Sequence, residues 1–284
     1  MKKILALLLA LCMIFALAAC GEAATDPSEA PASDAPESEA PASEAPAAES
    51  DLAYVQEKGT LIVGITNFEP MDYQNENGEW IGFDADLAKA FAESLGVEAQ
   101  FQEIEWDNKV FELDGKTIDV VWNGMTLTDE VLSAMECSNA YCNNAQVVIL
   151  PADIAEDYPD AASMADLQFA VESGSAGETM AIENGFNYTP VVDQATAVLE
   201  VSSGTCDAAI IDSLMAAAMV GEGTSYADLT YTINLNSEEY GVGFRKGSDL
   251  AAALNEFFAS AWADGTMQEL AETYGVSAAL IAQE

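Results

Sequence analysis

The stretch "IDVVWNGMTLTDEV", residues 118–131, decides the fold, because an apolar run gives way to polar and glycine residues before a helix begins. "IDVVW" at 118–122 predicts a buried strand, and Asn123 and Gly124 follow it as a turn. A short helix is expected to begin near Thr128. The backbone N–H groups of such a corner point at one spot, which suits the carboxylate of a small ligand.

Two earlier strands place this corner in a parallel sheet. "LIVGI" (61–65) and "AQFQEI" (99–104) have the apolar character of strands, and apolar residues at helical spacing predict a helix over 83–95 between them. A second short helix is expected over 107–115. This βαβαβ order predicts a parallel sheet covered by helices, with ligands bound beyond the carboxyl ends of the strands. Those ends are 66–68, Trp106 and Asn123–Gly124.

A second unit repeats the pattern. Strands are expected at 146–150, 168–172, 206–212 and 240–248, and helices after Gly174, over 195–203, over 249–265 and over 267–275. We therefore expect an α/β fold of two lobes with a cleft between them. The predicted first lobe comprises 52–145 and 239–284, the second comprises 146–238, and the chain crosses near 143–147 and 237–242.

The N-terminal residues indicate export. Lys2 and Lys3 precede an apolar run that ends in "LAAC" at 17–20, which resembles a bacterial lipobox. We expect a lipoprotein signal peptide over 1–19 and a lipidated Cys20, so that the protein is extracytoplasmic and anchored to the cell membrane. The alternative is an uncleaved membrane helix. Residues 20–51 repeat "SEAPA" motifs and predict a disordered acidic tether.

The composition excludes several classes of function. The formal net charge is −41, and a surface this acidic repels nucleic acid, so no nucleic-acid partner is expected. The chain has no histidine and no CxxC pair, so neither a metal site nor a cofactor is expected. Cys137 and Cys142 lie close enough in sequence for a disulfide, but two independent thiols fit the sequence equally well.

The chain resembles bacterial extracellular solute-binding proteins of family 3, the amino-acid-binding group that serves ABC importers. The stretches that carry the resemblance are "GFDADLAKAFAESLGV", "WDNKVFELDGKTIDVVWNGMTLT", "VESGSAGE", "CDAAIIDS" and "YGVGFRKGS". The resemblance implies a two-lobed periplasmic-binding-protein-like fold of type II with two hinge crossings. It also implies a small solute as ligand and an ABC permease and ATPase as partners. We further expect a monomer without a cofactor.

The resemblance assigns roles to individual residues. Phe68 matches an aromatic residue that stacks on the ligand, and Asn67 and Glu69 are the candidates for its usual acidic neighbour. Hydrogen bonds to the ligand are expected from Asn123, Gly124, Thr126 and Ser175. Asp212 matches the carboxylate that receives the ligand's α-amino group. The family's carboxylate-binding arginine falls at Val131, which is the main departure from the pattern.

Each assignment has a structural alternative. Asp212 and Ser175 both precede helices and fit as N-caps. Phe68 and Trp106 are candidate walls of the ligand pocket that also fit as core residues. Lys109, just past a strand end, is the candidate stand-in for the missing arginine, although it also fits as a solvated lysine. Glu172 or Glu178 would add negative charge to the cleft. We therefore expect a neutral or cationic solute, such as a neutral or basic amino acid or an amine without an α-carboxylate.

Three classes of function are compatible with the sequence. The leading one is a binding protein without chemistry of its own. A receptor coupled to a signalling protein would use the same cleft. An enzyme of dehydratase type would need a positioned acid beside a cation, for which the cleft offers Glu172 or Glu178 but no arginine.

Overall fold

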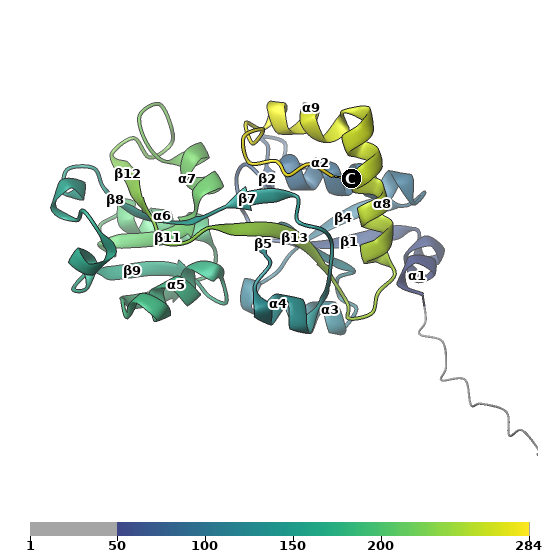
Figure 1. Ribbon diagram of the computed structural model, residues 1–284, viewed down its shortest axis with the longest axis horizontal. Helices are drawn as coiled ribbons and strands as arrows, with labels where there is room; N and C mark the ends of the chain where they lie inside the picture. Colours follow the sequence, from purple (N-terminus) through teal and green to yellow (C-terminus); the bar gives the residue numbers. More distant parts are fainter. Residues whose placement is uncertain (1–49, 284) are drawn as a thin grey trace, which may run out of the picture. The chain divides into compact units, whose positions relative to one another are not determined.

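The computed structural model describes residues 50–283 (Figure 1). The predicted signal peptide, Cys20 and nearly all of the predicted tether lie outside the described residues. Helix α1 begins at Asp51, the last residue assigned to the tether, and Ser50 caps it by accepting a hydrogen bond from the Ala53 N–H. Within 50–283, no helix is long and apolar enough to cross a membrane.

The first sheet has the strand order β4-β1-β5-β13-β6, with β7 also paired to β13. Strands β4 and β5 run parallel to β1, and β13 runs antiparallel to β5. The strands are β1 (Thr60–Ile65), β4 (Glu98–Glu103), β5 (Val120–Thr126), β6 (Glu136–Cys137), β7 (Cys142–Asn144) and β13 (Glu238–Phe244). A separate hairpin joins β2 (Tyr73–Gln74) and β3 (Trp80–Ile81).

Helices cover both faces of this sheet (Figure 1). Helices α2, α8 and α9 lie on one face, and α3 and α4 lie on the other. Trp122 of β5 is fully buried between Phe91 and Phe258, which belong to α2 and α8. The helices of this unit are α1 (Asp51–Lys58), α2 (Phe83–Ser94), α3 (Lys109–Asp114), α4 (Asp129–Ala134), α8 (Leu250–Asp264) and α9 (Thr266–Thr273).

The second sheet has the order β10-β9-β11-β8-β12. Apolar side chains on one of its faces pack against α5, and those on the other pack against α6 and α7. The strands are β8 (Gln146–Pro151), β9 (Gln168–Glu172), β10 (Asn187–Val191), β11 (Ala208–Asp212) and β12 (Leu229–Asn234). The helices are α5 (Ala176–Asn184), α6 (Gln194–Ser202) and α7 (Ser213–Met219).

The chain passes between the two sheets twice. It leaves the first sheet between β7 and β8 and returns between β12 and β13, close to the crossings expected from sequence. Strands β10 and β12 were not predicted, because polar and exposed residues interrupt their apolar pattern. The mixed α/β architecture was predicted.

One expectation about residues 118–131 is wrong. Asn123 and Gly124 do not form a turn after the strand, because β5 continues to Thr126. Strand β13, which comes from near the other end of the chain, pairs Gly241 with Met125 and Tyr240 with Thr126 and so extends β5. The expected short helix does begin after Thr128, whose side chain caps α4 by accepting from the Val131 N–H.

The structure decides between the two alternatives that the sequence left open for Cys137 and Cys142, which are not bridged. Cys137, Cys142 and Cys206 are free cysteines in the described part of the chain. Cys137 pairs with Gly243 and Cys142 pairs with Tyr240, so β13 holds the two cysteines at separate places along its length. Of the two alternatives, independent thiols agree with the structure.

Candidate functional site

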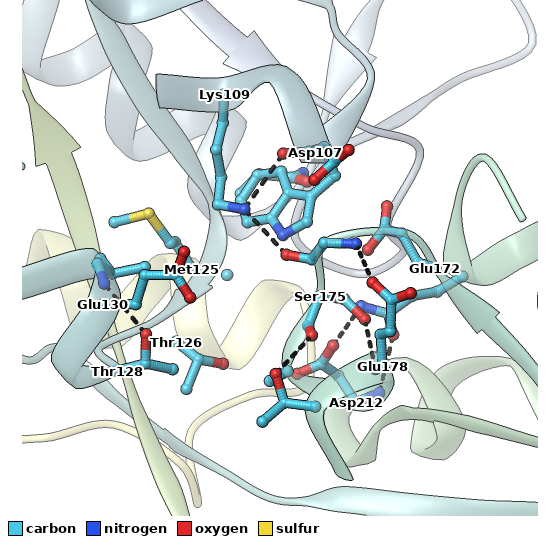
Figure 2. Close-up of a pocket in the computed structure, with 18 of the residues that line it drawn as sticks. Asp107, Lys109, Met125, Thr126, Thr128, Glu130, Glu172, Ser175, Glu178 and Asp212 are labelled. Carbon is cyan, nitrogen blue, oxygen red and sulfur yellow. Dashed lines mark hydrogen bonds between the residues drawn. The ribbon is translucent and has the colours of Figure 1, made fainter. Parts of the chain in front are cut away.

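A cavity of about 340 Å³ lies between the unit built on the first sheet and the unit built on the second, and residues of both units line it (Figure 2). Three groups of residues come from the first-sheet unit: the end of β5, the start of α4, and the turn that contains Trp106 and Lys109. The opposite wall comes from the loop between β9 and α5 and from Asp212 at the end of β11. These positions are the carboxyl ends of strands, where a ligand site is expected in such sheets.

Most of the predicted site residues line this cavity. They are Trp106, Lys109, Asn123, Gly124, Thr126, Glu172, Ser175 and Asp212, and Val131 and Glu178 line it as well. Asn67, Phe68 and Glu69 do not. Phe68 is 2% exposed, and a Cβ atom at Gly124 would lie 2.4 Å from its ring. The ring therefore packs against the backbone of Gly124 in the core and does not line the cavity.

Asp212 is the most heavily hydrogen-bonded carboxylate of the site. It is buried and accepts hydrogen bonds from the side chains of Asn144, Gln146, Gln194 and Tyr240. Asp212 occupies the N-cap position of α7, but its side chain makes no capping hydrogen bond there. Burial, with the nearby charge of Glu238, raises the pKa of Asp212 to about 8.

The hydrogen bonds of Asp212 continue into both crossings of the chain. Asn144 Nδ2 and Gln146 Nε2 also donate to Glu238 Oε1, at 2.7 and 2.8 Å. Thr126 Oγ1, at the end of β5, donates to the same oxygen at 2.9 Å. The polar residues of the two crossings therefore connect Asp212 to the first sheet, a link that sequence patterns did not reveal because its partners are far apart along the chain.

Asn123 has little hydrogen-bonding capacity left for a ligand. Its Oδ1 accepts from the N–H and hydroxyl of Thr66 at 3.0 and 2.8 Å. Its Nδ2 donates to the Thr66 carbonyl at 3.1 Å and to Asp72 Oδ2 at 2.8 Å. A side-chain amide carries two N–H donors and one acceptor oxygen, so Asn123 fixes the cavity wall more than it offers free groups to the cavity.

Lys109 connects the two walls of the cavity (Figure 2). Its Nζ donates to the carbonyl of Gly174 at 2.9 Å and to that of Trp106 at 3.2 Å, and it lies 4.8 Å from the centre of the Trp106 ring. Burial lowers the pKa of Lys109. Among the described residues that line the cavity, Lys109 is the only one that carries a positive charge. Two of its three donors are already used.

Ser175 and Val131 line opposite walls of the cavity. Ser175 caps α5, since its hydroxyl accepts from the Glu178 N–H at 3.1 Å, and it also lines the cavity. Val131 is buried and presents an apolar side chain where the resemblance places an arginine. Within 50–283, no group of three or more His, Cys, Asp or Glu side chains has the arrangement to hold a metal ion.

A sequence model of the bacterial extracellular solute-binding proteins, family 3, matches residues 61–277. The chain belongs to this family. The L-cystine-binding protein TcyJ of Escherichia coli (strain K12) is 30% identical to it over 224 residues, which cover 78% of this chain and 84% of TcyJ. The arginine-binding extracellular protein ArtP of Bacillus subtilis (strain 168) is 28% identical over 282 residues, which cover 95% of this chain and 96% of ArtP.

Solved structures support the same family. The ancestral amino-acid-binding protein AncCDT-1, described as a precursor of cyclohexadienyl dehydratase, has a TM-score of 0.73 and 30% identity and covers 79% of this chain and 99% of its own. A substrate-binding protein of an ABC uptake transporter from Streptococcus pneumoniae, with bound histidine, has a TM-score of 0.72 and 28% identity and covers 80% of this chain and 96% of its own. The predicted two-lobed fold is therefore confirmed.

Proposed function

We propose that this protein binds a neutral or basic amino acid in the cavity between its lobes and delivers it to an ABC permease and ATPase. Relatives named above bind cystine, arginine or histidine, and the one from Streptococcus pneumoniae serves an uptake transporter. We further propose that Cys20 anchors the protein outside the cell membrane and that it acts as a monomer without chemistry of its own. Residues 52–145 and 239–284 form the first lobe in this proposal, and 146–238 form the second.

The observation that carries the proposal is the charge of the cavity. Two buried carboxyl groups, Glu172 and Asp212, line it, and Lys109 is the one positive charge among the described residues of the lining. Val131 supplies no charge at the position where an arginine was expected. A ligand with an ammonium group balances this field, whereas a dicarboxylate adds to the negative charge.

The groups around the cavity suit an α-amino acid. Asp212 accepts the ammonium group, and Lys109, on the opposite wall with one donor unused, binds the carboxylate. Thr126, Ser175 and the first backbone N–H groups of α5 add donors for the same carboxylate. Because these groups come from both lobes, a bound amino acid stabilises the arrangement in which the lobes are in contact.

A melting-temperature screen tests this proposal. The purified protein is heated with each amino acid, with polyamines and with dicarboxylates such as glutamate and aspartate. A true ligand is expected to raise the melting temperature in proportion to the logarithm of its concentration once that exceeds the dissociation constant. If glutamate or aspartate stabilises the protein best, the proposed preference for neutral and basic amino acids is wrong.

Replacing Val131 with arginine is expected to shift preference toward dicarboxylates. The new guanidinium group would lie in the cavity wall, where hydrogen bonds to a charged group contribute about 1.5–3 kcal/mol. The affinity for glutamate relative to glutamine, measured by calorimetry, should therefore rise about 10- to 150-fold. Val131→Met is the control, because it adds bulk without charge; an equal shift in both variants would refute the charge explanation.

Replacing Gly174 with alanine is expected to weaken ligand binding. Gly174 has a φ of +71°, and a Cβ atom there would lie 2.7 Å from the Cα of Asp107 on the opposite wall. An overpacked contact costs about 1–3 kcal/mol, so the affinity for the amino acid found in the screen should fall about 5- to 150-fold. This loss should occur on binding, because the clash forms only where the lobes meet.

Gly185→Ala is the matched control for this variant. Gly185 lies in the same lobe with a φ of +70°, but a Cβ atom there would meet nothing within 4 Å. Both variants carry the cost of a left-handed backbone without glycine, about 1–2 kcal/mol, and should lower the unfolding midpoint similarly. Equal ligand affinities in the two variants would show that the contact between Gly174 and Asp107 does not matter for binding.

A further inference from the structure

Glu172 is a buried carboxyl group that faces the cavity without a full set of partners. It is the last residue of β9, is 3% exposed and lines the cavity (Figure 2). Its Oε1 atom is buried and has no hydrogen-bond partner among the described residues. Asp212, in contrast, accepts from four side chains. The Asp212 carboxylate therefore has several hydrogen-bond donors from the protein, whereas Glu172 Oε1 still lacks one.

The surroundings of Glu172 do not supply its missing partner. The charged groups near it are Asp212 at the end of β11, Asp193 before α6, and Lys109 on α3, and the amide of Gln194 is also close. The two aspartates repel a charge on Glu172. Lys109 attracts it, but the lysine donates to two backbone carbonyls instead. A buried carboxylate without a paired charge is costly, so a partner is expected from the ligand.

The charges of a simple zwitterion do not satisfy this site. In the pose proposed above, its ammonium group lies at Asp212 and its carboxylate faces Lys109, which leaves Glu172 unpaired. A ligand with one further positive charge supplies the missing partner of Glu172 and reduces the negative charge of the cavity. We infer that Glu172 binds a cationic group in the ligand's side chain and selects basic over neutral amino acids, an inference that rests on the proposed function.

The affinities for L-arginine and L-citrulline test this inference. The two amino acids have the same length and differ in the charge of the terminal group. Calorimetry at pH 8.5 on the purified wild-type protein should show arginine bound about 10- to 150-fold more tightly, the range for one hydrogen-bonded charged group. Binding of the two with equal affinity would overturn the role of Glu172 and leave the proposed function standing. Binding of no amino acid would overturn both.

Glu172→Gln should lower the ratio of arginine to citrulline affinity to about 1. Glu183→Gln is the matched control, because Glu183 is exposed on α5 in the same lobe and does not line the cavity. A preference for arginine that persists in Glu172→Gln would contradict the inference.

A pH series on the wild-type protein gives an independent test that needs no variant. Burial, with the charges of Asp212 and Asp193, raises the pKa of Glu172 to about 8. If the ionised carboxylate selects the cation, the ratio of arginine to citrulline affinity falls as the pH drops from 8.5 to 6. A ratio that stays constant or rises over this range would overturn the inference.

Discussion

Replacing Asp212 with asparagine is expected to weaken binding of the amino acid found in the melt screen by about 30- to 5,000-fold. This range corresponds to the cost of removing one partner from a buried, hydrogen-bonded charge pair, about 2–5 kcal/mol. Asp212 is suited to this role because it is 4% exposed and lies at a strand end that lines the cavity. Four side-chain donors fix its carboxylate before a ligand arrives.

The ligand-free protein, in contrast, should be stabilised by Asp212→Asn at high pH. Because the folded-state pKa of Asp212 is raised to about 8, its ionisation disfavours folding. For the wild-type protein this cost is absent below the ordinary pKa, grows as the pH rises toward 8, and is constant above that. Asp212→Asn removes the ionisation, so the contribution of this residue to the pH dependence of unfolding should disappear.

Calorimetric titrations and urea unfolding at pH 6 and pH 8.5 separate these two effects. Asp228→Asn serves as control, because Asp228 is exposed beside β12 and does not line the cavity. In the wild-type protein, binding of an ammonium group should release a proton below pH 8, which calorimetry in buffers of different ionisation enthalpy detects. If Asp212→Asn binds the ligand with wild-type affinity, Asp212 does not take part in binding.

Much of the fold could be predicted because local patterns determine it. Strands β1, β4, β8 and β9 and helix α2 follow apolar periodicity, and their bounds differ little from the predicted ones. The end of β5 could not be predicted, since its last residues are held by β13, which follows more than a hundred residues later. Periodicity within a window carries no information about such a partner.

Only those parts of the candidate site that depend on local sequence patterns could be predicted. Residues at strand ends, such as Asp212 and Glu172, line the cavity because sheet topology places them there. Phe68 also follows a strand, yet its ring packs in the core against Gly124, where a larger residue would leave no room for it. The partners of Asp212 were not foreseen, because Asn144 precedes it by 68 residues and only folding brings the crossings together.

A buried ionic cluster of Arg245, Asp51 and Asp119 holds α1 against the rest of the first lobe. Arg245 is 8% exposed, and its Nε donates to the Asp51 carboxylate oxygens at 3.2 and 3.0 Å. Its Nη1 donates to the carbonyls of Leu113 and Ile118 at 3.2 and 3.0 Å. Asp119, which is fully buried, lies 3.7 Å from Arg245 Nη2. A single side chain thus joins α1, the end of α3 and the start of β5.

Replacing Arg245 with leucine is expected to lower the free energy of unfolding by about 3–5 kcal/mol, because it leaves Asp51 without its paired cation and removes the side-chain donor to the Leu113 and Ile118 carbonyls. Urea unfolding of the ligand-free protein measures this loss. Lys89→Leu is the control: Lys89 pairs with Asp86 at 2.8 Å on the surface of α2, and an exposed pair of this kind contributes about 0–1 kcal/mol. Because Arg245 lies outside the cavity lining, the folded variant should bind the ligand with unchanged affinity. A loss below about 1 kcal/mol would show that water or rearranged side chains replace the guanidinium group.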